Sequence, residues 1–313
     1  MEFISYPKIS ESPAAQTKGG KWIAQEKIHG AHLVVGVDPN EVVIGKRKIW
    51  LSNDDVFFGW QLLRSRLTEI ARSFFNSCYR EIKSMYLYGE IFGGSYNHTE
   101  VYPVPGISPI QTGTNYCPEL NWAVFDVAIC TSNNEVFFCP FHWLDKTAKN
   151  FEVMQPPLLG TGTKSELQNL PSRYLSKVAK VLGLPEIKNN FAEGFVLKQA
   201  DEVSFHGRQA IKHKIPEFSD SIYNQSIAFN PNQVLSVEQI CKHIPQLATP
   251  IRINSARSKV GEKKIDIFAE SILDIMTDLE EVFPQSFATI DLEQCSFIEQ
   301  EILTYLRTRS NYQ

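Results

Sequence analysis

Short apolar runs separated by turns dominate the first two thirds of the chain. Residues 21–27, 31–38 and 41–47 are rich in apolar and β-branched side chains, and the turn sequence DPN separates the last two. Runs of this length that are bounded by turn residues predict β-strands. We expect the three to form an antiparallel meander, in which the sequence KIHG is the first turn.

The spacing of apolar residues predicts further elements up to about residue 230. Helical spacing predicts a helix within 54–83, and a shorter helix over 172–183 is predicted to stop at Gly183. Residues 95–120 are rich in proline, glycine, serine and threonine, which predicts a long loop. Further strands are predicted over 84–94, 121–130, 135–141, 193–199 and 208–214.

The strand pattern stops after about residue 229. Residues 264–283 and 291–309 instead have the apolar spacing of amphipathic helices. We therefore expect an α+β fold with two domains: residues 1–229 with mixed, mostly antiparallel sheets, and a helical C-terminal domain over 230–313.

Composition narrows the class of protein. An apolar content of 43% and a charged content of 21% over 313 residues are typical of a soluble globular chain. The first residues show no secretory leader and no run is long enough to span a membrane, so we expect a cytoplasmic protein without a membrane partner. The six cysteines form no CxxC pair, which indicates reduced thiols and disfavours a zinc ribbon.

The net charge of −4 is unevenly distributed. Residues 231–313 contain 12 acidic and 8 basic residues, so the first 230 residues are balanced. Basic clusters occur at 45–48, 207–214 and 252–264. Each could be a solvated face, or together they could line a phosphate-binding surface, and composition leaves both readings open.

Lys27, in the sequence KIHG, is the first residue with candidate chemistry. Taken alone, it is either a solvent-facing turn lysine or a nucleophile in a pocket. A nucleophilic amine must be neutral, and attack on a nucleotide α-phosphate also requires cations that offset the developing charge. Arg47, Lys212 and Lys214 are available for this, and the last two, being two apart in a strand, project from one face.

A nucleotide site also requires carboxylates and an aromatic ring. Glu90 and Glu193 each lie at a predicted strand end beside glycine, where one could serve a divalent metal and the other the ribose hydroxyls. Phe125 in the sequence VFDV could stack on the base. Taken singly, each has an ordinary structural explanation: a turn for Glu193, a core residue for Phe125.

The order of these motifs is more specific than any one of them. KIHG, GKR, YGEI, VFDV, EGFVLK and IKHK occur in this order over some 190 residues. In that order they resemble the nucleotidyltransferase motifs of covalent lysyl-AMP enzymes. The nearest resemblance is to the RNA ligase family that includes the phage double-strand RNA nick-sealing ligase and the trypanosome editing ligases, which carry histidine where His29 stands. The sequence NSARSKVGE and the helices after it also look like that family's helical C-terminal domain.

The resemblance implies a role for each matched residue. Lys27 would carry AMP with His29 as its partner, Glu193 would serve the metal-dependent steps, and Lys212 and Lys214 would bind the α-phosphate. The nucleotide-binding set would consist of Glu26, Lys27, Arg47, Glu90, Phe125, Asp126, Lys212 and Lys214. The implied cofactors are ATP and Mg²⁺, with Mn²⁺ as a substitute. The implied fold is the ATP-grasp-like ligase domain of mixed sheets, with a helical module in place of the OB-fold of DNA ligases.

Two positions depart from the family pattern. Gln25 stands where an arginine commonly precedes the Glu-Lys pair, and His32 stands where asparagine is frequent. Both departures bear on how the substrate is bound rather than on the lysine chemistry.

The expected function is ATP-dependent joining of RNA 3′-hydroxyl and 5′-phosphate ends through a lysyl-AMP and an RNA-adenylate, with nicked duplex RNA as the expected partner. The alternatives are a DNA ligase, a capping-type nucleotidyltransferase, or a non-catalytic RNA-end binder on the same fold. The basic stretch 252–264 predicts that the C-terminal domain engages RNA. Removal of that domain should leave a soluble adenylyltransferase, or an aggregating fragment if the helices only cover apolar surface.

Overall fold

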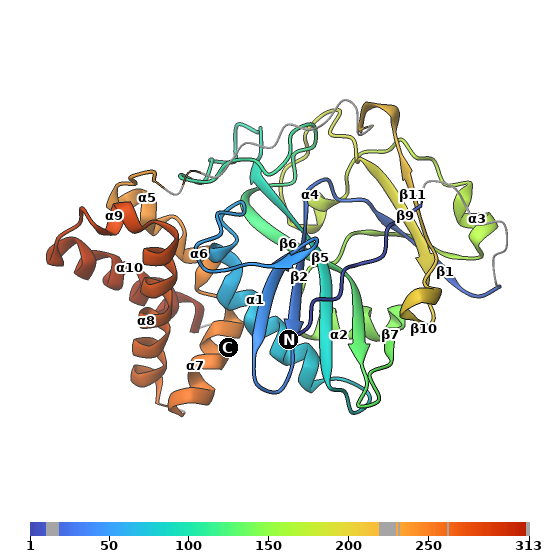
Figure 1. Ribbon diagram of the computed structural model, residues 1–313. Helices are drawn as coiled ribbons and strands as arrows, with labels where there is room; N and C mark the ends of the chain where they lie inside the picture. The colour runs from blue at the N-terminus through green and yellow to red at the C-terminus, as the bar shows by residue number, and fades with distance from the viewer. Residues whose placement is uncertain (11–18, 219–229, 231, 262, 311–313) are drawn as a thin grey trace.

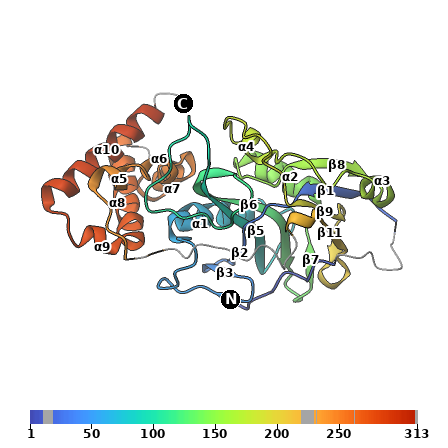
Figure 2. The same ribbon diagram turned by 90° about the horizontal axis from the view of Figure 1, so that it is seen from above.

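Two antiparallel β-sheets and a group of C-terminal helices make up the fold. The structure, a computed structural model, describes residues 1–10, 19–218, 230, 232–261 and 263–310. The larger sheet occupies the middle, with the smaller sheet on one side and the C-terminal helices on the other (Figure 1). Seen from above, the same three parts follow one another along the molecule (Figure 2). The predicted α+β class with a helical C-terminal part is confirmed.

The larger sheet has seven strands, and every neighbouring pair is antiparallel. Its two longest strands, β5 and β6, lie next to each other and pair along most of their length. In spatial order the strands are β10 (Val203–Ser204), β7 (Val136–Phe138), β6 (Cys117–Cys130), β5 (Ser84–Ser95), β2 (Ala31–Val37), β3 (Val42–Lys46) and β4 (Ile49–Trp50).

The smaller sheet has four strands, and its strand order differs from the predicted meander. Its order is β11 (Ala210–Lys214), β9 (Gly194–Gln199), β1 (Trp22–Glu26) and β8 (Leu158–Gly162). The predicted pairing of β2 with β3 is confirmed. The predicted pairing of β1 with β2 is wrong, because β1 pairs with β8 on one side and β9 on the other.

The reason for the correction is that both edges of β1 are already hydrogen-bonded within the smaller sheet. The main-chain ladder continues past its end, where the Lys27 N–H donates to the Gly194 carbonyl at 2.8 Å and the Glu26 N–H to the Pro157 carbonyl at 2.8 Å. All five residues of β1 are buried, as expected of a central strand. The KIHG sequence therefore crosses from one sheet to the other instead of turning back.

The helices before residue 230 agree only partly with the sequence predictions. The helix predicted within 54–83 is α1 (Gln61–Asn76), and that predicted over 172–183 is the shorter α4 (Val178–Val181), followed by Gly183 at φ +70°. The sequence analysis missed α2 (Phe141–Asn150), in which Leu144, Thr147 and Ala148 are buried at helical spacing. This helix is short, and the predicted strand over 135–141 runs into its first turn. A further short helix is α3 (Lys164–Gln168).

The C-terminal helices pack against α1, which lies between them and the larger sheet. Their apolar residues, including Ile275 and Ile302, belong to the same buried cluster as Leu67 and Phe74 of α1 and Val35 of β2. No helix in the described part of the chain is long and apolar enough to cross a membrane. The helices are α5 (Val237–Cys241), α6 (Ile244–Leu247), α7 (Pro250–Val260), α8 (Lys264–Val282), α9 (Pro284–Phe287) and α10 (Leu292–Ser310).

The expected domain boundary at 229/230 adjoins residues 219–229 and 231, which lie outside the described residues. The division into two domains therefore stays a prediction. What the structure does provide is a shared apolar core between α1 and the helices beyond the boundary.

Candidate active site

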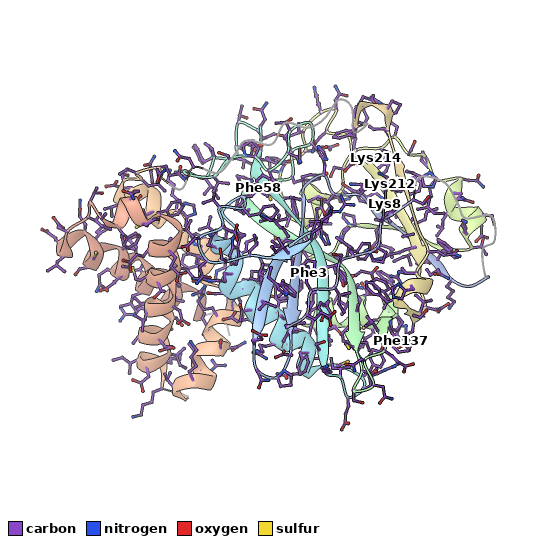
Figure 3. All side chains as sticks on the ribbon, in the orientation of Figure 1. Phe3, Lys8, Phe58, Phe137, Lys212 and Lys214 are labelled. Carbon is purple, nitrogen blue, oxygen red and sulfur yellow. The ribbon has the colours of Figure 1, made fainter. Side chains whose placement is uncertain are left out.

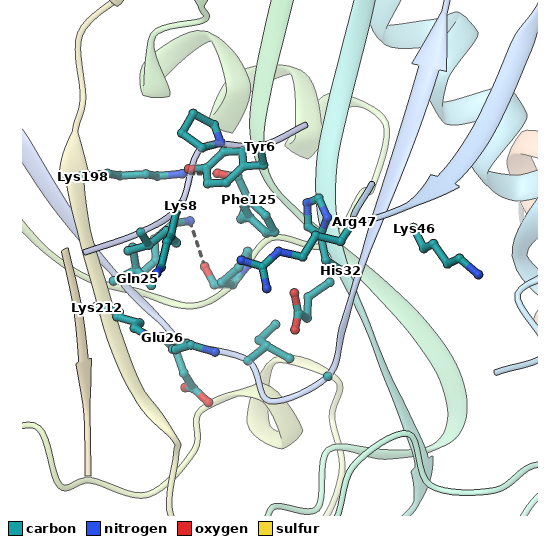
Figure 4. Close-up of a pocket in the computed structure, with 18 of the residues that line it drawn as sticks. Tyr6, Lys8, Gln25, Glu26, His32, Lys46, Arg47, Phe125, Lys198 and Lys212 are labelled. Atoms are coloured by element: carbon teal, nitrogen blue, oxygen red, sulfur yellow. Dashed lines mark hydrogen bonds between the residues drawn. The ribbon is translucent and has the colours of Figure 1, made fainter. Parts of the chain in front are cut away.

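A cavity of about 710 Å³ lies where the KIHG segment crosses between the two sheets. It receives residues from β1, β2, β3, β5, β6, β9 and β11, so both sheets form its walls (Figure 4). Gly30 is required at the crossing, because a Cβ atom there would lie 2.2 Å from the Ile91 carbonyl oxygen. The predicted nucleotide-binding residues that line the cavity are Glu26, Lys27, Arg47, Glu90, Phe125, Lys212 and Lys214.

The Glu193 carboxylate organises the predicted catalytic residues. Its Oε2 accepts from Lys27 Nζ at 2.7 Å and lies 3.3 Å from His29 Nδ1, and its Oε1 lies 2.8 Å from Lys214 Nζ. Lys27 and Glu193 are 166 residues apart in the chain. Gly194 allows β11 to approach this closely, because a Cβ atom at its φ of +142° would lie 1.9 Å from the His213 carbonyl oxygen.

The ionisation of Glu193 reflects these neighbours. Burial alone would raise its pKa, but the charge of Lys27 and the contacts with His29 and Lys214 lower it to about 2. Glu193 is only 1% exposed, so its negative charge is stabilised almost entirely by protein cations. The carboxylate therefore stays ionised over the physiological pH range.

The other two carboxylates of the cavity have pKa values shifted the opposite way. Burial raises the pKa of Glu90 to about 7, with Lys27 opposing and Glu193 adding to the shift. Burial also raises the pKa of Glu26 to about 7, although its oxygens accept from the Ser176 hydroxyl at 2.6 Å and the Lys177 N–H at 2.8 Å. Glu26 is thus tied to the protein, whereas Glu90 faces the space beside Lys27.

Phe125 lies at an aromatic end of the cavity. The Tyr6 ring meets it edge-on at 5.2 Å, and His32 lies 5.7 Å from it. Burial lowers the pKa of His32 to about 4, so this departure from the family pattern is a neutral imidazole, stacked on Tyr88 at 6.0 Å. The other departure, Gln25, donates to the Pro156 carbonyl at 3.2 Å.

Asp126, predicted beside the base, is not among the residues that line the cavity. Arg208 donates to both of its oxygens at 2.7 Å, and the Tyr6 hydroxyl donates to Oδ2 at 2.9 Å. Lys198, whose pKa burial lowers to about 8, lies 3.5 Å from the same oxygen. These contacts make Asp126 the centre of a buried ion cluster behind Phe125, and its direct contact with a nucleotide stays a prediction.

Among the described residues that line the cavity, cations outnumber carboxylates. Lys212 and Lys214 alternate along β11 and both line it, as strand geometry predicted. Lys46, Arg47 and Lys48 line the opposite side, at the end of β3 and after it. An excess of cations around a single space favours a polyanionic ligand.

Sequence reasoning missed the contribution of the amino-terminal segment. Tyr6, Pro7, Lys8 and Ile9 line the cavity, although this segment has no strand or helix period. Figure 3 shows Lys8 on the same side of the molecule as Lys212 and Lys214. The only signal available in the sequence was a lysine beside an aromatic residue, which is too common to indicate a site.

A divalent metal is compatible with this set of donors. In the described residues, no group of three or more His, Cys, Asp or Glu could hold a metal ion. Magnesium does not require such a group, because it is commonly held by one or two carboxylates together with substrate phosphates and water. Glu193, ionised and in contact with the cavity-lining Lys27 and Lys214, fits that pattern and remains the predicted metal ligand.

The basic stretch 252–264 is only partly available to RNA. Arg252 is 2% exposed and donates to Asp278 at 2.5 Å, and Asp278 also accepts from Ser65 of α1 at 2.6 Å. Lys259 pairs with Glu270 at 2.9 Å. The expectation that this whole stretch binds RNA is therefore wrong for Arg252, which holds α7 and α8 against α1.

Comparison with known proteins identifies the family. The family model described as RNA ligase matches residues 20–214. The mitochondrial RNA-editing ligase 2 of Trypanosoma brucei brucei (strain 927/4 GUTat10.1) is 26% identical over 206 residues, which cover 58% of this chain and 49% of the relative.

Similar solved structures include RNA ligases of Naegleria gruberi. A mutant in the apo form has 18% identity and a TM-score of 0.42, covering 63% of this chain and 50% of that one. A mutant with ATP and Mn has 17% identity and a TM-score of 0.44, and the match covers 64% of this chain and 51% of that one. The chain thus spans about half the length of the relatives it matches. The family match covers most of the chain and every predicted site residue, and the protein belongs to the RNA ligase family.

Proposed function

We propose that the protein is an ATP-dependent RNA ligase that joins a 3′-hydroxyl to a 5′-phosphate, with nicked duplex RNA as its substrate. The observation that carries the proposal is the position of Lys27, at the edge of a cation-rich cavity and in contact with Glu193. Family membership and the editing-ligase relative support RNA as the substrate class.

In the first step, Lys27 Nζ attacks the α-phosphorus of ATP. A phosphorus–nitrogen bond forms, the bond to the pyrophosphate oxygen breaks, and the amine proton leaves to solvent. The Glu193 carboxylate, 2.7 Å from Lys27 Nζ, orients the amine.

The remaining residues bind and orient the nucleotide. Phe125 stacks on adenine, and Glu90 contacts the ribose hydroxyls. Arg47, Lys212 and Lys214 offset charge on the phosphoryl oxygens. Glu193 would hold magnesium, which would supply further charge neutralisation.

Two further transfers complete the proposed reaction. The RNA 5′-phosphate oxygen attacks the phosphorus of the lysyl-AMP, the phosphorus–nitrogen bond breaks, and the Lys27 amine leaves with a proton taken from solvent. The 3′-hydroxyl then attacks the RNA 5′-phosphorus and loses its proton to solvent, which forms the phosphodiester as the bond to AMP breaks and AMP is released. All three steps place an anionic phosphate in the same cation-rich cavity.

Labelling with ATP tests the first step. Wild-type protein incubated with α-labelled ATP and magnesium should retain label after denaturation, and Lys27→Ala should retain none. Lys27→Arg should also fail, because it keeps the positive charge beside Glu193 but lacks the nucleophilic amine. An exposed lysine outside the cavity, changed by Lys188→Ala, serves as the control and should label like wild type.

Nicked duplexes with RNA or DNA on either side of the break test the substrate. Sealing of the RNA nick in preference to the DNA nick is expected. A wild-type protein that takes no label but binds RNA ends would indicate the non-catalytic alternative. Efficient labelling with preferential sealing of DNA would refute the substrate assignment alone.

A further inference from the structure

The amino-terminal segment forms one wall of the nucleotide cavity. Tyr6, Pro7, Lys8 and Ile9 all line it. The family match begins only at residue 20, so this wall comes from residues outside the matched region. Within the segment, Lys8 is the residue that carries charge into the cavity.

Hydrogen bonds on both sides of Lys8 fix the backbone that carries it. On one side, the Tyr88 hydroxyl donates to the Ile4 carbonyl at 2.9 Å, and the Tyr6 hydroxyl donates to Asp126 at 2.9 Å. On the other side, the Lys212 N–H donates to the Ser10 carbonyl at 2.9 Å, where the segment bridges to β11. Lys8 therefore has a defined place beside β11 and does not belong to a free terminus.

The position of Lys8 is intermediate between the two ends of the cavity. In Figure 4 it lies between the aromatic pair Tyr6 and Phe125 and the cation Lys212. Phe125 marks the proposed base end, and Lys212 marks the proposed phosphate end. A ligand that occupies both ends passes the Lys8 side chain.

The Lys8 ammonium has no carboxylate partner among the described residues, and its side chain is exposed. This distinguishes it from Lys27 and Lys214, whose amines contact Glu193. An ammonium with no carboxylate partner in the described part of the chain, next to other cations, is a binding group for a phosphate oxygen.

We propose that Lys8 binds a phosphate group of the ligand in this cavity, carried either by the polyphosphate of ATP or by the 5′ end of RNA. The inference rests on the proposed function for the choice of these two ligands. It adds a phosphate-binding residue from outside the family-matched region.

Equilibrium binding separates this inference from catalysis. The full chain is titrated with α,β-methylene-ATP and magnesium, which cannot transfer AMP, and separately with nicked duplex RNA bearing either a 5′-phosphate or a 5′-hydroxyl. Lys8→Ala should weaken binding of one phosphate ligand by roughly tenfold, since a hydrogen bond to a charged group is lost. Lys8→Arg should restore most of the affinity.

The pattern of loss identifies the source of the phosphate. Weaker binding of the ATP analogue alone assigns Lys8 to the polyphosphate. Loss of the preference for 5′-phosphate over 5′-hydroxyl RNA assigns it to the RNA end. Lys188→Ala, in an exposed lysine outside the cavity, should change neither titration.

Equal affinities of Lys8→Ala and wild type for both ligands would overturn the inference, as would a wild-type protein that binds neither. Lysine labelling with α-labelled ATP is measured in parallel. A protein that binds the analogue through Lys8 but never labels would refute the proposed ligase activity and leave the Lys8 inference standing.

Discussion

Three side chains from two distant segments of the chain meet at one carboxylate. Glu193 contacts Lys27, His29 and Lys214, so the proposed nucleophile, its proposed histidine partner and a proposed phosphate-binding lysine share one buried anion. Removing one partner of a buried charge pair leaves the other charge uncompensated. Substitutions within this cluster will therefore affect folding as well as chemistry, and variants that keep the charge, such as Lys27→Arg, are the more informative ones.

At the same scale, substitution of Phe125 tests whether this residue stacks on the adenine base. Stacking of a base on an aromatic ring contributes roughly 1–3 kcal/mol, so Phe125→Ala should raise the ATP concentration for half-maximal labelling by about 5- to 150-fold. Phe125→Tyr keeps the ring and should stay near wild type. An unchanged ATP requirement in Phe125→Ala, with the protein folded, would remove Phe125 from the base site.

At the scale of elements, the link between β1 and β2 decides where the proposed nucleophile Lys27 lies. Because β1 pairs with β8 and β9, its end points into the space between the sheets, and the four residues that follow cross that space. The same sequence folded as a hairpin would leave Lys27 at the edge of one sheet, away from Glu193.

A buried histidine joins the C-terminal helices to the loop before β6. His243, which precedes α6, is 0% exposed, and its Nε2 lies 3.0 Å from the Pro105 carbonyl oxygen, to which it donates. Burial lowers the pKa of this imidazole from 6.5 to about 4. The folded state therefore holds His243 neutral, while the unfolded chain takes up a proton below pH 6.5. Its contribution to stability is present above pH 6.5 and is lost as the pH falls toward 4.

Unfolding by urea at pH 7.5 and pH 5.0 measures this effect. Between these pH values the free energy of unfolding should change about 2 kcal/mol less favourably in wild type than in His243→Gln, which lacks the titrating group. His206→Gln, in an exposed histidine, should change as wild type does. Equal changes in wild type and His243→Gln would contradict the neutral buried imidazole.

At the scale of the whole molecule, the C-terminal helices and the catalytic region share one apolar core. Ile275 and Leu279 of α8 belong to the same buried cluster as Leu67 and Phe74 of α1. Truncation after residue 230 would expose this surface to water. Of the two outcomes that the sequence left open, the structure favours aggregation over a soluble adenylyltransferase.

Expression of residues 1–230 tests this expectation. The fragment should be recovered aggregated, as seen by gel filtration, and should take little label from ATP. Co-expression of residues 231–313 should restore a soluble complex, because the missing apolar surface is returned. A monomeric, folded and labelling fragment would show instead that the helices form a separate domain.

The sequence by itself determined many of the strands, the two long C-terminal helices and the residue types available for chemistry, although it left α2 and β8 unpredicted. The spacing of apolar and polar residues along the chain predicts these strands and the two long C-terminal helices. The same local spacing places Lys212 and Lys214 on one face of a strand. The six ordered motifs indicated the family, because together they resemble the nucleotidyltransferase motifs of its members.

Only the tertiary structure decided which strands and charges became neighbours. An apolar strand such as β1 has no local feature that selects its partners, and its two ladders depend on β8 and β9, more than 130 residues away. Arg252 likewise looks like a surface cation in sequence and is buried because Asp278 meets it in the fold. Lys8 joins the cavity only because hydrogen bonds from distant tyrosines hold its segment there. Pairing and burial are long-range properties, and local sequence does not contain them.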